Sequence, residues 1–64
     1  MQTVKMINTS RFEVTLMKDA DDMYHIIHGH VHGPLEVHVD PMSDLRMANI
    51  LFNLKVEEYE NRLH

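Results

Sequence analysis

The chain has 64 residues, enough for one small domain covering residues 1–64. It contains no cysteine, which excludes disulfide bonds and thiolate zinc sites, and its formal net charge of −4 disfavours nucleic-acid binding. A chain of this size buries little apolar surface by itself, so we expect it to gain stability from a metal ion or from self-association.

The first residues of the chain and its longest apolar run indicate where in the cell we expect the protein to be. The most apolar run, Ile50-Leu51-Phe52, extends only to Leu54 and is far too short to cross a bilayer. The chain does not start with the basic residues and apolar core that are typical of a signal peptide. We therefore expect a cytoplasmic protein that binds neither membranes nor nucleic acid.

The amino-terminal part of the chain alternates apolar and polar residues, which is typical of β-strands with one buried face. We expect strands at residues 3–7, 11–17, 23–31 and 35–39. The segments between them are rich in turn-forming residues. These segments are Asn8-Thr9-Ser10, Asp19-Ala20-Asp21-Asp22 and His32-Gly33-Pro34.

The lengths of the turns predict how the strands pair. Turns of three, four and three residues favour a four-stranded antiparallel meander with one apolar face. On that face Gly29 lies opposite Phe12, whose ring would cover the gap that a glycine leaves. The turns pair Ile7 with Arg11, Lys18 with Met23, and Val31 with Leu35. The predicted apolar face consists of Val4, Met6, Phe12, Val14, Leu16, His25, Ile27, Gly29, Val31, Leu35, Val37 and Val39.

A helix is expected at residues 41–62, which completes an α+β fold of the order ββββα. Asp40 can cap this helix and Pro41 suits its first position, while Ser43 is a competing cap. No helix breaker follows before Arg62. Helical spacing places one apolar stripe against the apolar face of the sheet. The stripe consists of Leu45, Ala48, Phe52, Val56, Tyr59 and Leu63.

The same helix carries a second apolar stripe. Its members follow the spacing i, i+3, i+4 and i+7 and point away from the first stripe. One sheet covers only one side of a helix, so we expect this stripe to form an interface, most simply in a homodimer. The alternatives are a groove for a different protein, or a wide stripe partly covered by the sheet edge and the amino-terminal segment. The stripe consists of Met47, Ile50, Leu51 and Leu54.

The other face of the predicted sheet carries polar residues and a small apolar cluster of Met17, Tyr24 and Ile26. Large apolar side chains that are grouped on a solvated face are typical of binding surfaces. We therefore expect this cluster to contact a target protein.

Four of the six histidines lie between His25 and His32. In the predicted register His28 lies opposite His38 on one neighbouring strand and Glu13 on the other, within reach of one metal ion such as zinc or nickel. The alternatives are ordinary polar positions of a solvated face, or a pH switch in which protonated His28 and His38 repel each other. His25 is expected on the inner face with a hydrogen-bonded ring.

Two segments resemble known families. Gly29-His30-Val31-His32 is similar to the last metal-binding motif of calcineurin-like metallophosphoesterases, but the Asp-x-His, Gly-Asp and Gly-Asn-His motifs of that family are missing. The acidic turn before Tyr24, followed by a strand and an amphipathic helix, resembles HicB-type antitoxin domains. The first resemblance implies no enzyme without the missing motifs, and the second implies a small regulatory protein.

These patterns favour a non-enzymatic protein that binds other proteins. No nucleophile–base pair and no glycine-rich phosphate loop stands out in the sequence. Our main hypothesis is an acidic, homodimeric inhibitor or antitoxin-like adaptor, of the kind that phages and mobile elements encode. The alternative is a histidine-based metal-binding or pH-sensing protein that uses His28 and His38.

Overall fold

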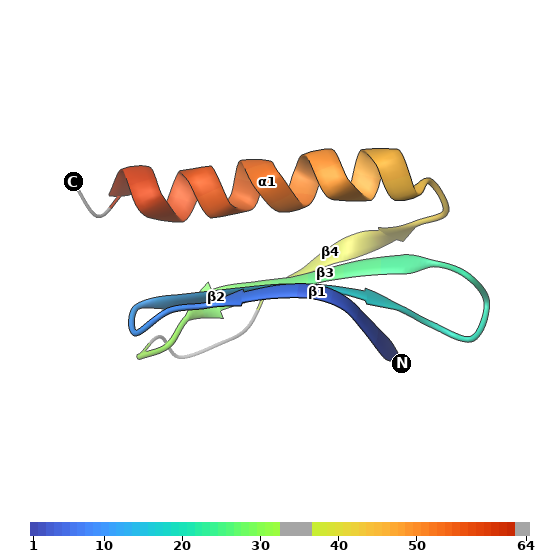
Figure 1. The fold of residues 1–64 in the computed structure, drawn as a ribbon, viewed down its shortest axis with the longest axis horizontal. Helices are drawn as coiled ribbons and strands as arrows, with labels where there is room; N and C mark the ends of the chain where they lie inside the picture. The colour runs from blue at the N-terminus through green and yellow to red at the C-terminus, as the bar shows by residue number, and fades with distance from the viewer. Residues whose placement is uncertain (33–36, 63–64) are drawn as a thin grey trace.

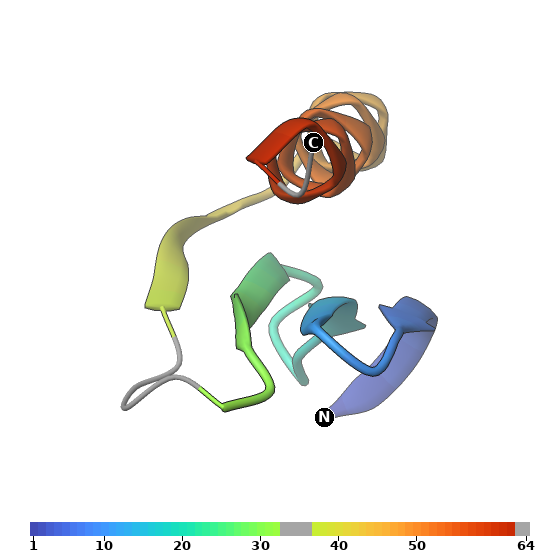
Figure 2. The ribbon, with the colours of Figure 1, turned by 90° about the vertical axis from the view of Figure 1, so that its left-hand side faces the viewer.

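The computed structural model describes residues 1–32 and 37–62, without the side chains of residues 37–40 and 62. It consists of one antiparallel sheet with the strand order β1-β2-β3-β4 and one helix that lies along a single face of that sheet (Figures 1 and 2). The predicted α+β arrangement is therefore confirmed. The elements are β1 (Gln2–Asn8), β2 (Phe12–Lys18), β3 (Tyr24–His30), β4 (Val37–Met42) and α1 (Leu45–Arg62).

The helix begins later than expected. Residues 40 and 41 belong to β4, and the side chain that caps α1 is Asp44, whose Oδ1 accepts the N–H groups of Arg46 (2.8 Å) and Met47 (3.4 Å). The prediction of a start at residue 41 with Asp40 or Ser43 as cap is wrong. A residue before proline favours extended backbone, and proline is tolerated in an edge strand such as β4, so Pro41 extends the strand.

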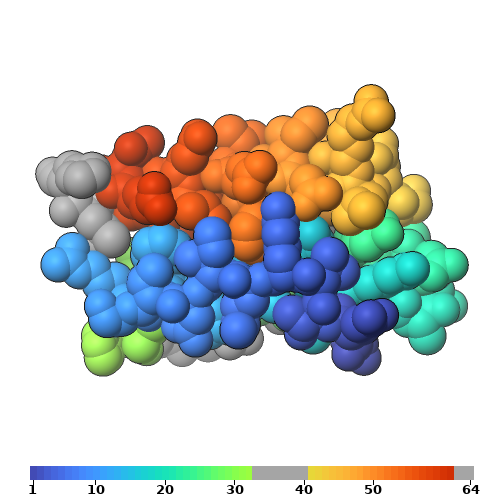
Figure 3. All heavy atoms as spheres, in the orientation of Figure 1, coloured from blue at the N-terminus to red at the C-terminus, as the bar shows by residue number. Residues whose placement is uncertain are grey.

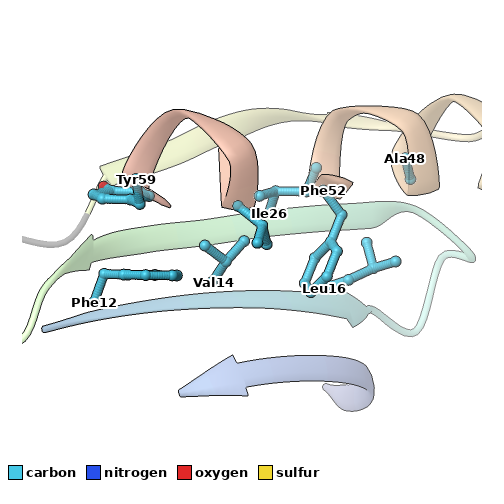
Figure 4. Close-up of a cluster of buried hydrophobic side chains, with 8 residues drawn as sticks. Phe12, Val14, Leu16, Ile26, Ala48, Phe52 and Tyr59 are labelled. Atoms are coloured by element: carbon cyan, nitrogen blue, oxygen red, sulfur yellow. The ribbon is translucent and has the colours of Figure 1, made fainter. Parts of the chain in front are cut away.

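The core lies between α1 and the sheet (Figure 4). It confirms four positions of the predicted helix stripe, whereas Leu45 is 41% exposed and Leu63 lies outside the described residues. The buried apolar side chains are Phe12, Val14, Leu16 and Ile26 from the sheet and Ala48, Phe52, Val56 and Tyr59 from the helix.

The first hairpin is tighter than expected. The backbone N–H of Thr9 donates to the carbonyl of Phe12 (2.9 Å), and Thr9 Oγ1 accepts the N–H of Phe12 (3.0 Å), which leaves a loop of Ser10 and Arg11. The predicted pairing of Ile7 with Arg11 is therefore wrong, since Ile7 pairs with Val14. The shift reverses the two faces of β1 over residues 5–8.

The reversal places a cation over the core. Lys5 pairs with Leu16, shares the helix-facing side of the sheet, and lies with its Nζ 4.5 Å from the centre of the Phe52 ring. A cation over an aromatic face is attracted by the ring quadrupole. A β-bulge between Thr3 and Lys5 adjusts the register at the start of β1. The half-buried Lys5, rather than the expected Val4 and Met6, therefore covers this margin of the core.

The second hairpin also differs from the prediction by one residue. Asp19 Oδ1 accepts the N–H groups of Asp21 (2.8 Å) and Met23 (3.0 Å), and the N–H of Asp19 donates to the carbonyl of Met23 (2.9 Å). Asp22 has a φ of 62°, a left-handed conformation that aspartate tolerates and that suits the last position of a three-residue hairpin loop. Lys18 consequently pairs with Tyr24 instead of Met23.

Because side chains alternate along a strand, this shift exchanges the two faces of β3. Ile26 and His28 lie on the helix-facing side, opposite Leu16 and Val14. Gly29 lies on the open side opposite Glu13, so the predicted cover of Gly29 by Phe12 is wrong. Residues 33–36, which include most of the predicted third turn and the predicted start of the fourth strand, lie outside the described residues.

The hydrogen bonds of Asp19 in the second hairpin should make the folding stability depend on pH in the acidic range. The hydrogen bond that His25 Nε2 donates to Asp19 Oδ2 (2.6 Å) is the main cause that lowers the pKa of Asp19, and the Met23 N–H adds to it. A lowered carboxyl pKa stabilises the fold above the pKa of the unfolded chain, about 3.9, and this contribution is lost as the pH falls through the folded value.

Asp19→Asn is therefore expected to lower the thermal midpoint at pH 7, and the midpoints of variant and wild type should come together only as the pH falls through the lowered pKa of folded Asp19. Circular dichroism melts between about pH 2 and pH 7 measure both effects. Asp21→Asn is the matched control, because no side-chain hydrogen bond or ion pair of Asp21 occurs within the described ranges. A constant difference at every pH would contradict the assigned role of Asp19.

Candidate functional site

The side of α1 that points away from the sheet carries large apolar side chains. Met47, Ile50 and Leu54 are 50%, 49% and 47% exposed, and we call these three residues the outer helix patch. Leu51, the fourth member of the predicted stripe, is half-buried and packs against the core. Within residues 1–32 and 37–62, no other element covers this side of the helix, which forms the upper layer in Figures 1 and 3.

The patch follows directly from the helical spacing of the sequence. Ile50 comes three residues after Met47 and four before Leu54, so the three side chains lie on consecutive turns of one face. The buried stripe around Phe52 lies on nearly the opposite side. The helix therefore has two apolar faces, of which the sheet covers one.

Charged side chains border the outer helix patch. Arg46 and Glu57 are exposed on one flank, and neither forms an ion pair with any residue that the structure describes. On the other flank Lys55 Nζ lies 3.3 Å from Glu58 Oε2. An apolar centre with a charged rim is the usual composition of a protein–protein interface.

The apolar cluster predicted on the open face of the sheet does not form. Ile26 has no exposed surface and belongs to the core, and Tyr24 packs against the core on the same side. Of the three predicted residues, only Met17 lies on the open face, where it pairs with Thr3 and His25. The physical reason is the one-residue shift in the register of the second hairpin, which exchanges the faces of β3.

The predicted metal ligands are not brought together. His28 lies on the helix-facing side, whereas Glu13 lies on the open side and accepts a hydrogen bond from Thr15 Oγ1 (3.2 Å). His38 pairs with Ile27 instead of His28, and its side chain lies outside those described. The described residues contain no group of three or more potential metal ligands.

The structure reveals a cluster of rings that the sequence did not indicate. The phenol of Tyr59 lies 2.8 Å from His28 Nδ1, its ring stacks on Phe12 with centroids 5.1 Å apart, and His30 meets it edge-on at 4.9 Å. Figure 4 shows Phe12 and Tyr59 facing each other between helix and sheet. The position of Tyr59 on the buried stripe was visible in the sequence, but its histidine partners depend on the register.

The expected role of His25 is confirmed in one respect only. Its ring is hydrogen-bonded, to Asp19, but it lies on the open side of the sheet and not on the predicted inner face. It stabilises the turn from outside the core.

Comparison with family models, with curated proteins and with solved structures finds no match to this chain. No helix among the described residues is long and apolar enough to cross a membrane. The assignment of a function therefore depends on the surface chemistry of the chain.

Proposed function

We propose that this chain is a small, non-enzymatic regulatory protein that binds other proteins and associates with itself through the outer helix patch. The observation that carries the proposal is the exposure of Met47, Ile50 and Leu54, each about half open to water on one side of a single helix. A contiguous apolar patch with a charged rim is typical of a protein interface.

The size of the hydrophobic effect supports association. Complete burial of a Leu, Ile or Met side chain is worth about 1.5–3 kcal/mol, so burial of the exposed half gains about 1 kcal/mol for each residue. Three such residues in each of two copies gain several kcal/mol before the entropy cost of association is subtracted. A weak to moderate dimer is the expected outcome.

The sheet edge is a poorer site for self-association than the helix. β1 is an edge strand with exposed Val4, Met6 and Ile7, so it offers unpaired backbone groups to another chain. However, it contains a β-bulge and an inward-pointing lysine, Lys5, and both features discourage edge-to-edge pairing. This difference favours the outer helix patch.

A dimer of this kind presents its acidic surface to a target. The chain carries ten acidic and six basic residues, and a complementary basic surface on another protein would attract it over a long range. An inhibitor or antitoxin-like adaptor fits these properties, with the dimer supplying two copies of the target-binding surface.

The test of self-association is sedimentation velocity over a concentration series from about 1 µM to about 1 mM. Wild type is expected to shift from monomer to dimer within this range, and Met47→Glu with Leu54→Glu to remain monomeric. The double variant should keep its helical circular dichroism and thermal midpoint, since both positions are exposed in the single chain.

Asn53→Glu is the matched control, because it adds a negative charge to an exposed position of the same helix outside the patch. It should dimerise within about threefold of wild type. Wild-type protein that stays monomeric over the whole series, or a Met47→Glu, Leu54→Glu variant that still dimerises, would show that the patch is not the interface.

A further inference from the structure

The charges of α1 are distributed unevenly along the helix. Its first turn contains no acidic residue and carries Arg46, whereas Glu57, Glu58 and Glu60 lie in its last two turns. The partial negative charge of a helix C-terminus makes this an unfavourable place for carboxylates. Among the described side chains Lys55 offsets Glu58, whereas Glu57 and Glu60 form no ion pair.

Arg46 and Glu57 have a special relation to the outer helix patch. They are eleven positions apart, close to three helical turns, so both lie on the same flank of the patch and about 16 Å apart along the axis. The midpoint of the patch falls between Ile50 and Leu51. The midpoint between Arg46 and Glu57 falls one residue further, a difference of about 1.5 Å.

Because these two midpoints nearly coincide, one symmetry axis can align both the patches and the charges of two copies. A two-fold axis perpendicular to two antiparallel helices keeps each flank on the same side and exchanges the helix ends. Placed near Leu51, such an axis superimposes the two patches and brings Arg46 of each copy beside Glu57 of the other. It also places the N-terminal half of one helix against the acidic C-terminal half of its neighbour.

We propose that α1 pairs with α1 of a second copy in antiparallel orientation about a two-fold axis near Leu51, with two reciprocal Arg46–Glu57 ion pairs. This proposal rests on the proposed self-association through the outer helix patch and adds its orientation and register. The two helices form the inner layers of a dimer whose sheets lie outside, so both open sheet faces stay free for a target.

A parallel arrangement fits the same charges badly. An axis parallel to the helices keeps each position at the same height and exchanges the two flanks, so Glu57 of each copy would lie beside Glu58 of the other. Like charges at such distances disfavour association. Charge complementarity therefore selects the antiparallel orientation.

A charge-exchange cycle tests the register. Arg46→Glu and Glu57→Arg should each weaken dimerisation about tenfold, because each replaces two attractive contacts by two repulsive ones, and the combined variant should return to within about threefold of wild type. The combined variant keeps the net charge of −4. The two positions are too far apart within one helix to interact at about 0.15 M salt, so any coupling must act between copies.

Glu60→Arg is the control with the same change in net charge as Glu57→Arg, at an exposed position further from the patch. It should change the dissociation constant by less than about threefold. Additive effects of the two exchanges, in a protein whose dimer is abolished by Met47→Glu with Leu54→Glu, would overturn the antiparallel register and leave the proposed function intact. A wild-type monomer would overturn both.

Cysteine cross-linking gives an independent measure of orientation, because the chain has no cysteine of its own. Oxidation of a mixture of Arg46→Cys and Glu57→Cys proteins should give mainly the mixed disulfide. Each variant oxidised alone should remain largely unlinked. Efficient self-linkage of Glu57→Cys would place the two copies of position 57 side by side and contradict the proposal.

Discussion

Replacement of Phe52 by alanine is expected to destabilise the fold by about 3–5 kcal/mol, the range found when a buried phenylalanine is truncated. Phe52 is 2% exposed, and its side chain extends from α1 toward Leu16 at the centre of the core (Figure 4). The truncation also removes the ring beneath the Lys5 ammonium group. Since a domain of this size has little stability to lose, we expect most Phe52→Ala molecules to be unfolded at 25 °C.

Urea denaturation followed by circular dichroism measures this effect. Phe52→Leu is the graded variant, because it keeps most of the apolar volume and should cost clearly less, so that its loss can be measured even if Phe52→Ala does not fold. Asn53→Ala, an exposed neighbour, should change the free energy of unfolding by less than about 0.5 kcal/mol. Equal effects of Phe52→Ala and Asn53→Ala would contradict the position of α1 on the sheet.

The second large effect tests the register of β3. Ile26 has no exposed surface and faces the helix, whereas its neighbour Ile27 is half-buried on the open face. Ile26→Ala is expected to cost about 2–5 kcal/mol of unfolding free energy, and Ile27→Ala about 1 kcal/mol or less. The two variants differ by one position and involve the same chemical change, so each serves as the control for the other.

Urea midpoints of the two alanine variants decide between two registers. The register expected from a four-residue second turn puts Ile27 in the core and Ile26 outside, which predicts the reverse order of stability. A larger loss for Ile27→Ala would therefore contradict the observed pairing of Lys18 with Tyr24.

The histidines show how much of the candidate chemistry depends on the same register. His28 and His30 were expected on the solvated face, but they lie on the helix-facing side and contact Tyr59. The half-buried ring of His28 is tolerated there because it forms a hydrogen bond with the Tyr59 hydroxyl. The pattern of alternate histidines in β3 thus contributes to the packing of the end of α1 against the sheet.

The sequence by itself determined the number and order of the elements, the buried stripe of α1 and the outer helix patch. Alternation of apolar and polar residues predicts a strand whatever its pairing register. Helical spacing places Phe52 on one side of α1 and Ile50 on the other, independently of the sheet. For this reason the candidate interface could be predicted from residues 45–62 alone. The side chains of Met47, Ile50 and Leu54 are each about half exposed, as expected for a helix side that the sheet does not cover.

Only the tertiary structure decided which faces of β1 and β3 are buried, whereas alternation had already placed Phe12, Val14 and Leu16 of β2 on the buried face. Thr9 and Asp19 each accept two backbone N–H groups with their side chains, and these bonds select hairpin loops that differ in length from those that turn composition favours. Because strand side chains repeat every two residues, these changes in register exchange the faces of β3 and of residues 5–8 of β1. The predicted metal site and the predicted cluster on the open face both depended on which side of each strand a side chain lies. The outer helix patch depends only on helical spacing, so the shifts in strand register did not affect it.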